Sequence, residues 1–123
     1  MKNILMTCVF AAGLMSVPAF ASSTDANGVA SDAIMAGDFA QAETLLRQGL
    51  AQNPQDATRL LNLAFVLQST GRAAEAASVY EKVLQMESNP VVAVADPYTI
   101  SQPARAKRVA KKGMAALPES VKR

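Results

Sequence analysis

The stretch GDFAQAETLLRQGL, residues 37–50, recurs 34 residues later as GRAAEAASVYEKVL, residues 71–84. The matching positions are a glycine, an alanine, a large side chain and a leucine: Gly37 and Gly71, Ala42 and Ala76, Leu46 and Tyr80, Leu50 and Leu84. This period is typical of a helix-turn-helix unit that buries its apolar face only by stacking on a copy of itself. The sequence therefore predicts a stacked helical repeat, an architecture that more often binds partners than catalyses reactions.

The residues around the two stretches divide into four helical segments. Apolar side chains recur at the three-and-four spacing of one helix face. Turn and proline signals separate these segments, at Gly37-Asp38, Asn53-Pro54, Thr70-Gly71-Arg72 and Ser88-Asn89-Pro90. We therefore expect an all-α fold of two antiparallel helix pairs. Their helices are expected at about residues 25–36, 39–52, 57–69 and 73–86.

These residues resemble the tetratricopeptide repeat, whose unit packs small residues between two helices around a glycine turn. The resemblance assigns residues 22–90 to two repeats, about 23–56 and 57–90. The positions that match its packing residues are Ala30, Gly37, Ala42, Leu46, Ala64, Gly71, Ala76 and Tyr80. One departure is Gly49, which fills a position that usually holds alanine. The resemblance implies an α-solenoid of two helix-hairpin repeats that works as a protein-interaction scaffold.

The charge distribution separates the repeats from the C-terminal part. From Ser22 to Asp96 four basic residues face nine acidic ones, a balance of −5, whereas from Pro97 onward seven basic residues face one acidic residue, a balance of +6. We expect a linker over residues 91–100 and, over 101–123, a basic helix of about 102–117 with its tail. Its basic face holds Arg105, Lys107, Arg108, Lys111 and Lys112. In the family that the sequence resembles, a final helix commonly covers the exposed end of the stack.

The first residues match an export signal. Lys2 precedes an apolar run, and Val17-Pro18-Ala19-Phe20-Ala21 ends in the small-x-small pattern that a signal peptidase accepts. We expect residues 1–21 to be a signal peptide that is cleaved after Ala21, and a periplasmic or secreted mature protein without a transmembrane segment. Cys8 would leave with the leader, so the mature chain would hold neither cysteine nor histidine.

This composition disfavours catalysis and bound cofactors. Without mature Cys or His there is no Cys or His nucleophile system and no zinc site of the usual kind, and no glycine-rich phosphate loop occurs. The carboxylates fall at turns and on polar helix faces, where solvation accounts for them. We expect a non-enzymatic protein with no metal and no cofactor.

The resemblance also implies a groove lined by the first helix of each repeat. The positions that correspond to its outward face are Asn27, Ser31, Ile34 and Met35 in repeat one, and Thr58, Leu61, Asn62, Phe65, Gln68 and Ser69 in repeat two. Asn62 is suited to bond a peptide backbone, and Leu61 with Phe65 to form an apolar contact. For Leu61 and Phe65, packing against the C-terminal segment is an equal alternative. This face lacks Lys and Arg, which disfavours recognition of a free peptide C-terminus.

Two functions therefore remain open from the sequence. One is an adaptor that binds a peptide or partner helix in the groove; the other is an envelope-associating structural protein whose basic helix binds anionic lipid, a polymer or an acidic partner. Because such stacks need about three units to bury a continuous core, we also expect a homo-oligomer or a larger complex. Nucleic acid is disfavoured because no aromatic residues interleave the basic cluster.

Overall fold

The computed structural model describes residues 23–95 and 103–122, with no side-chain description for residues 23–27. The expected signal peptide, and residues 96–100 of the expected linker, lie outside this part. The elements in chain order are α1 (Ser23–Met35), α2 (Phe39–Gln52), α3 (Ala57–Ser69), α4 (Ala73–Gln85), β1 (Val91–Val92), β2 (Ala104–Arg105) and α5 (Ala106–Ala116). The all-α fold of two stacked helix hairpins and a further C-terminal helix is thus confirmed.

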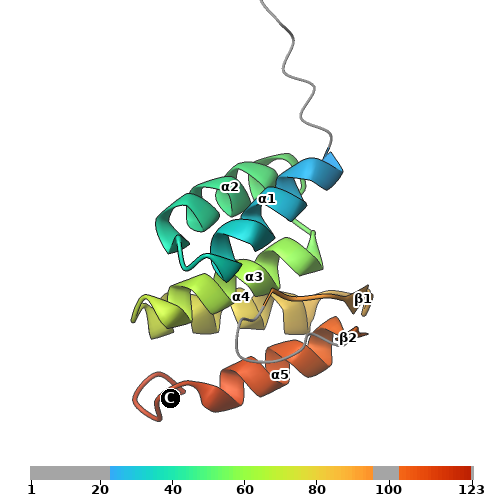
Figure 1. The fold of residues 1–123 in the computed structure, drawn as a ribbon. Helices are drawn as coiled ribbons and strands as arrows, with labels where there is room; N and C mark the ends of the chain where they lie inside the picture. The colour runs from blue at the N-terminus through green and yellow to red at the C-terminus, as the bar shows by residue number, and fades with distance from the viewer. Residues whose placement is uncertain (1–22, 96–102, 123) are drawn as a thin grey trace, which may run out of the picture.

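The helices form a stack in which each hairpin lies on the next. Figure 1 shows α1 and α2 at one end, α3 and α4 in the middle and α5 at the other end. α2 packs on α3, and α5 packs on both α4 and α3. The last helix therefore covers the end of the second hairpin, where a third repeat would otherwise begin.

The two hairpins turn in the same way because a glycine ends the first helix of each. Gly37 and Gly71 have φ angles of 78° and 79°, which L side chains rarely adopt. The following amides close each turn by donating to a carbonyl five residues earlier, Asp38 to Ala33 at 2.9 Å and Arg72 to Leu67 at 2.8 Å. The 34-residue period thus has a backbone basis as well as a side-chain one.

Aspartates begin two of the helices. The Oδ1 atom of Asp38 accepts from the N–H of Gln41 at 3.1 Å, and Oδ1 of Asp56 accepts from the N–H of Arg59 at 3.0 Å. Each cap satisfies an N–H that the first helical turn leaves free. This explains why α2 and α3 begin where the sequence predicts.

The core runs through the interfaces between helices. Ala42, Ala64 and Ala76 have no exposed surface, and Ala30 has 1%. These small side chains let neighbouring helix backbones approach closely, and Leu46 and Tyr80, 1% and 4% exposed, fill the space one turn further along α2 and α4.

The C-terminal helix begins later than the sequence suggests. Helix was expected from about Gln102, but Ala104 and Arg105 pair antiparallel with Val92 and Val91, and α5 begins at Ala106. The N–H of Ala106 donates to the carbonyl of Pro90 at 2.9 Å, which continues this pairing. Arg105 therefore lies in β2 at the entrance to α5 rather than on the helix face.

Candidate interaction surfaces

The face of α3 that the resemblance assigns to the groove carries its own cover. Leu61 and Asn62 are each 1% exposed, whereas Thr58, Phe65 and Gln68 are half-buried and Ser69 is exposed. These six residues share one side of α3, but the middle of that side is closed to solvent. The sequence predicted that they share one side of the helix but did not show what covers it.

Part of the cover is the segment of residues 89–95, which we call the strap. The N–H of Ala95 donates to Oδ1 of Asn62 at 3.0 Å, and Val92 of the strap is 4% exposed. At its other end, Asn89 accepts from Nη1 of Arg105 at 3.1 Å and, through Oδ1, from the N–H of Lys107 at 3.0 Å. The strap thus joins the outer side of α3 to the start of α5, and Asn62 binds backbone of its own chain.

The accessible part of this face lies around Phe65. Its ring meets that of Phe39, at the start of α2, edge to face, with centroids 6.3 Å apart and an interplanar angle of 70°. Both rings are half-buried, and Ser31 of α1 is half-buried as well. Phe39 was not among the expected groove residues, because its turn position gave no signal of contact across the hairpins.

The remaining expected groove positions in repeat one differ in their exposure. Ile34 has no exposed surface and packs in the core, whereas Met35 is 57% exposed. Asn27 lies in α1, but its side chain is outside the described part. Repeat one therefore contributes Ser31 and Met35 as described surface residues, and fewer contacts than the resemblance implied.

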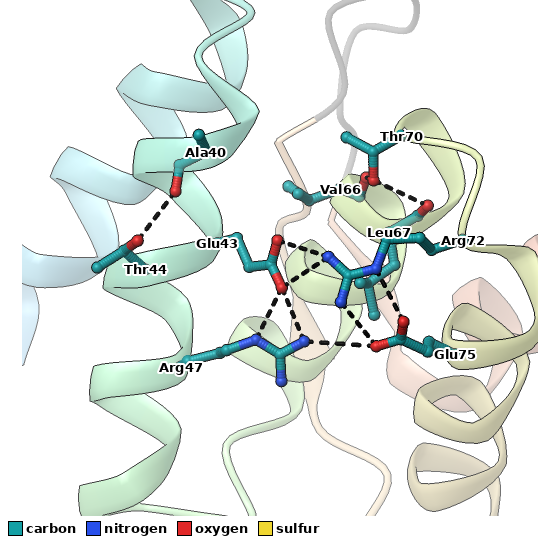
Figure 2. A network of polar contacts seen from close by, with 9 residues as sticks. All are labelled: Ala40, Glu43, Thr44, Arg47, Val66, Leu67, Thr70, Arg72 and Glu75. Carbon is teal, nitrogen blue, oxygen red and sulfur yellow. Dashed lines mark hydrogen bonds and ion pairs between the residues drawn. The ribbon is translucent and has the colours of Figure 1, made fainter.

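Four charged side chains link α2 of the first repeat to the start of α4 in the second repeat. Figure 2 shows Glu43 and Arg47 of α2 facing Arg72 and Glu75 at the start of α4. Nη1 of Arg72 lies 2.8 Å from Oε2 of Glu43, Nη2 of Arg72 lies 2.7 Å from Oε2 of Glu75, and Nε of Arg47 donates to Oε1 of Glu43 at 2.8 Å. Hydrogen bonds from Arg47, and then from Arg72, lower the pKa of Glu43, although partial burial opposes them.

The network explains a change of residue within the period. Arg72 stands 34 residues after Asp38, the cap of α2, and α4 has no side-chain cap. Arg72 instead reaches back to the first repeat, while Glu75 supplies negative charge in the first turn of α4. Its hydrogen bond to Arg72 lowers the pKa of Glu75. Sequence reasoning missed this link, for which the charge change at the cap position was the available signal.

A buried arginine accounts for the glycine in α2. Arg59 of α3 is 5% exposed and its Nη1 lies 3.0 Å from Oδ2 of Asp56. A Cβ added at Gly49 would collide with the Arg59 guanidinium. The usual alanine is therefore absent because the arginine occupies its space.

The inner side of α5 packs closely on α4. Ala106, Ala110 and Leu117 are buried, and a Cβ added at Gly113 would collide with the ring of Tyr80. The hydroxyl of Tyr80 donates to Oε1 of Gln68 at 3.0 Å, and burial raises the pKa of Tyr80 to about 12. Tyr80 thus connects α3, α4 and α5.

The outer side of α5 is basic. Arg108, Lys111 and Lys112 are exposed and Lys107 is half-buried, and none of the four forms an ion pair with a carboxylate that the structure describes. Arg105 is exposed beside them and bonds the strap. Three of the five expected basic residues therefore lie together on the free side of the helix.

Within residues 23–95 and 103–122 no helix has the length and apolar character to cross a bilayer, and no group of three acidic, His or Cys residues is placed to hold a metal ion.

The geometry defines a helical-repeat protein, and comparisons with known proteins agree with this class. A model of the tetratricopeptide repeat family matches residues 33–95, about half of the chain. The chain belongs to this family, whose repeats are protein-interaction modules and are typically not enzymes. It is similar to the cellulose synthase operon protein C of Komagataeibacter xylinus, with 36% identity over 66 residues, which is 54% of this chain and 5% of that protein. No solved structure matches.

Proposed function

We propose that this interaction module binds an extended partner segment on the outer side of α3. The observation that carries the proposal is the bond between Asn62 and the N–H of Ala95, because it is a contact between a groove side chain and a backbone donor. A peptide whose backbone follows the strap would meet the same acceptor. Half-buried Phe65 and Thr58 would supply its first contacts.

A partner that reaches Asn62 must take the place of part of the strap. The carboxamide of Asn62 accepts one backbone N–H from Ala95, and losing that partner without a substitute costs about 1–3 kcal/mol. A segment that presents its own N–H removes this cost. The strap therefore favours partners that bind through backbone donors over partners that bind only through apolar side chains.

Partner capture by matched variants tests this proposal. Envelope extract is passed over the immobilised protein, Phe65→Ala and Thr44→Ala, and bound proteins are quantified by mass spectrometry. Thr44 is an exposed α2 residue whose hydroxyl bonds only its own helix, to Ala40 at 3.0 Å. We expect Phe65→Ala to lower capture of a specific partner by about tenfold, in the range of an interface hot spot, and Thr44→Ala to leave it unchanged.

Melting temperatures separate binding from folding in this comparison. If the Phe65→Ala protein has the melting temperature of the unmodified protein and still captures the partner, the proposal that the partner binds at this face of α3 is contradicted. A large fall in melting temperature would instead assign Phe65 to the core, against the proposal.

We further propose that the protein is exported. The support is the N-terminal pattern of Lys2, an apolar run and the Val17–Ala21 cleavage signal. Intact-mass measurement of the protein from its native host tests this directly. A mature chain that begins at Ser22 in the periplasmic or secreted fraction supports export, and an uncleaved chain in the cytoplasm contradicts it.

A second function is favoured by the free charges of α5. We propose that Arg108, Lys111 and Lys112 bind an anionic partner surface, since none pairs with a described carboxylate. Salt distinguishes this function from the groove, because exposed charge contacts weaken with screening and apolar contacts do not. The Lys111→Gln/Lys112→Gln variant should lose the salt-sensitive binding and keep the groove binding; equal loss of both, or of neither, would contradict this assignment.

A further inference from the structure

The free side of α1 is the most apolar exposed helix surface among the described residues. Val29 and Met35 are 46% and 57% exposed, and Asp32 is exposed between them on the helical arc. Ala30, Ala33 and Ile34 on the other side of α1 are buried against the stack. An end unit of a solenoid normally has a polar outer side, so this end is not capped by the residues that the structure describes.

The two ends of the stack carry opposite charge. The α1 helix holds two acidic residues, Asp25 and Asp32, and no basic one, whereas residues 103–122 hold six basic residues and one acidic one. On the free side of α5, Arg108, Lys111 and Lys112 surround Ala115, an exposed small residue that allows close approach. The acidic end is α1 and the basic end is α5, at opposite ends of the molecule (Figure 1).

We propose that the anionic partner of α5 is the α1 end of a second copy of this chain. The inference rests on the proposal that the outer side of α5 binds an anionic surface. In this arrangement Arg108 and Lys112 of one copy face Asp32 of the next, and Val29 and Met35 are covered by α5. The contact is head to tail, so each copy keeps one free end and the assembly grows as a chain rather than closing as a dimer.

The apolar residues favour a second copy over a lipid or polymer surface. An anionic lipid surface would neutralise the α5 charges but would leave Val29 and Met35 of α1 in water. A second copy satisfies both ends with one contact. It also extends the stack in the direction in which the two repeats already pack, α1 and α2 on α3 and α4, with α5 beyond.

Charge-reversal variants at the two ends provide the test. Asp32→Lys blocks the acidic end, and Arg108→Glu/Lys112→Glu blocks the basic end. Sedimentation velocity at low salt should show concentration-dependent growth of the unmodified protein that is lost at high salt. Each reversed variant should associate at least about tenfold more weakly than the unmodified protein, because like charges then face each other at the contact.

Mixing the two blocked variants distinguishes this contact from other kinds of association. Arg108→Glu/Lys112→Glu keeps a native α1 and Asp32→Lys keeps a native α5, and the two reversed ends are also complementary to each other. An equal mixture should therefore regain the concentration-dependent growth that each variant alone has lost. Lys82→Glu, which reverses an exposed charge on the side of α4, should associate like the unmodified protein. Circular dichroism checks that every variant remains helical.

Three outcomes would overturn the inference. They are a monomeric unmodified protein at low salt and high concentration, a mixture that associates no better than either variant alone, and equal weakening by Lys82→Glu. Binding to phosphatidylglycerol vesicles without self-association would refute the second copy while leaving the basic surface intact. A protein that neither binds the vesicles nor self-associates would refute the basic surface itself.

Discussion

Gly49 and Arg59 show how a single pair can depart from a repeat pattern for a packing reason. The 34-residue register predicts a small residue at position 49, but only the structure shows the guanidinium that needs the space. The buried arginine could not be predicted, because Arg59 follows its cap Asp56 in the first turn of a helix, where charged residues are usually solvated.

Replacing Gly49 tests this account at the residue scale. Gly49→Ala should lower the free energy of unfolding by about 1–3 kcal/mol, because the added methyl group collides with Arg59 in a filled space. Gly28→Ala in α1 is the matched control, since a Cβ there has no neighbour within 4 Å. It should raise stability by about 0.5–1 kcal/mol. Urea unfolding measures both, and an equal gain in the two variants would show that Arg59 does not occupy this space.

Asn62 illustrates what a resemblance transfers and what it omits. The sequence suggested that it bonds the backbone of a peptide partner, and in the structure it accepts a backbone N–H from Ala95 of its own chain. The packing of the strap on α3 could not be predicted from the sequence, because a β-branched run after Pro90 is compatible with a linker as well as with a packed segment.

The helices were predictable at the level of elements, and the strand pairing was not. Periodicity and turn signals gave α2 and α3 at their observed bounds, Phe39–Gln52 and Ala57–Ser69. Two-residue strands such as β1 and β2 have no periodic signal, so the start of α5 was placed too early. The sequence contains the acidic and basic residues that link α2 and α4, but it does not show that they contact one another.

The link between α2 and α4 predicts a pH dependence. The pKa of Glu43 is lowered from 4.5 by its bonds to Arg47 and Arg72, so the folded state favours the charged carboxylate. Its contribution to stability is therefore full above pH 4.5 and is lost as the pH falls through the lower folded-state pKa. Unfolding measured from pH 7 to pH 3 should show a smaller acid loss for Glu43→Gln than for Glu87→Gln, an exposed control. Identical curves would mean that the network contributes nothing.

The contact between α4 and α5 has its own reporter in Tyr80. Gly113→Val should force α5 away from the ring, expose the phenol, and move its titration from about 12 toward the ordinary 10. Because burial favours the neutral phenol, the stabilisation that it carries is full below pH 10 and is lost as the pH rises through about 12. Ultraviolet absorbance in a Tyr98→Phe background follows Tyr80 alone. A titration that stays near 12 with native helicity would contradict the close packing.

At the scale of the whole molecule, the chain is a short solenoid whose last helix takes the place of a third repeat. α5 covers the second hairpin, while the α1 end exposes Val29 and Met35. The sequence predicted the acidic body and the basic tail from composition. It could not place them at opposite ends, because that arrangement follows from the order of stacking. The α1 end and the α5 end thus form separate surfaces.

The central claim is that the outer side of α3 binds a partner segment, and photo-crosslinking in the native host tests it most directly. A photoreactive phenylalanine analogue is placed at Phe65, on the α3 face, or at Thr44, on the exposed side of α2. The account predicts a discrete crosslinked partner from position 65 and none from position 44. Equal crosslinking from both positions, or crosslinking from position 44 alone, would contradict it.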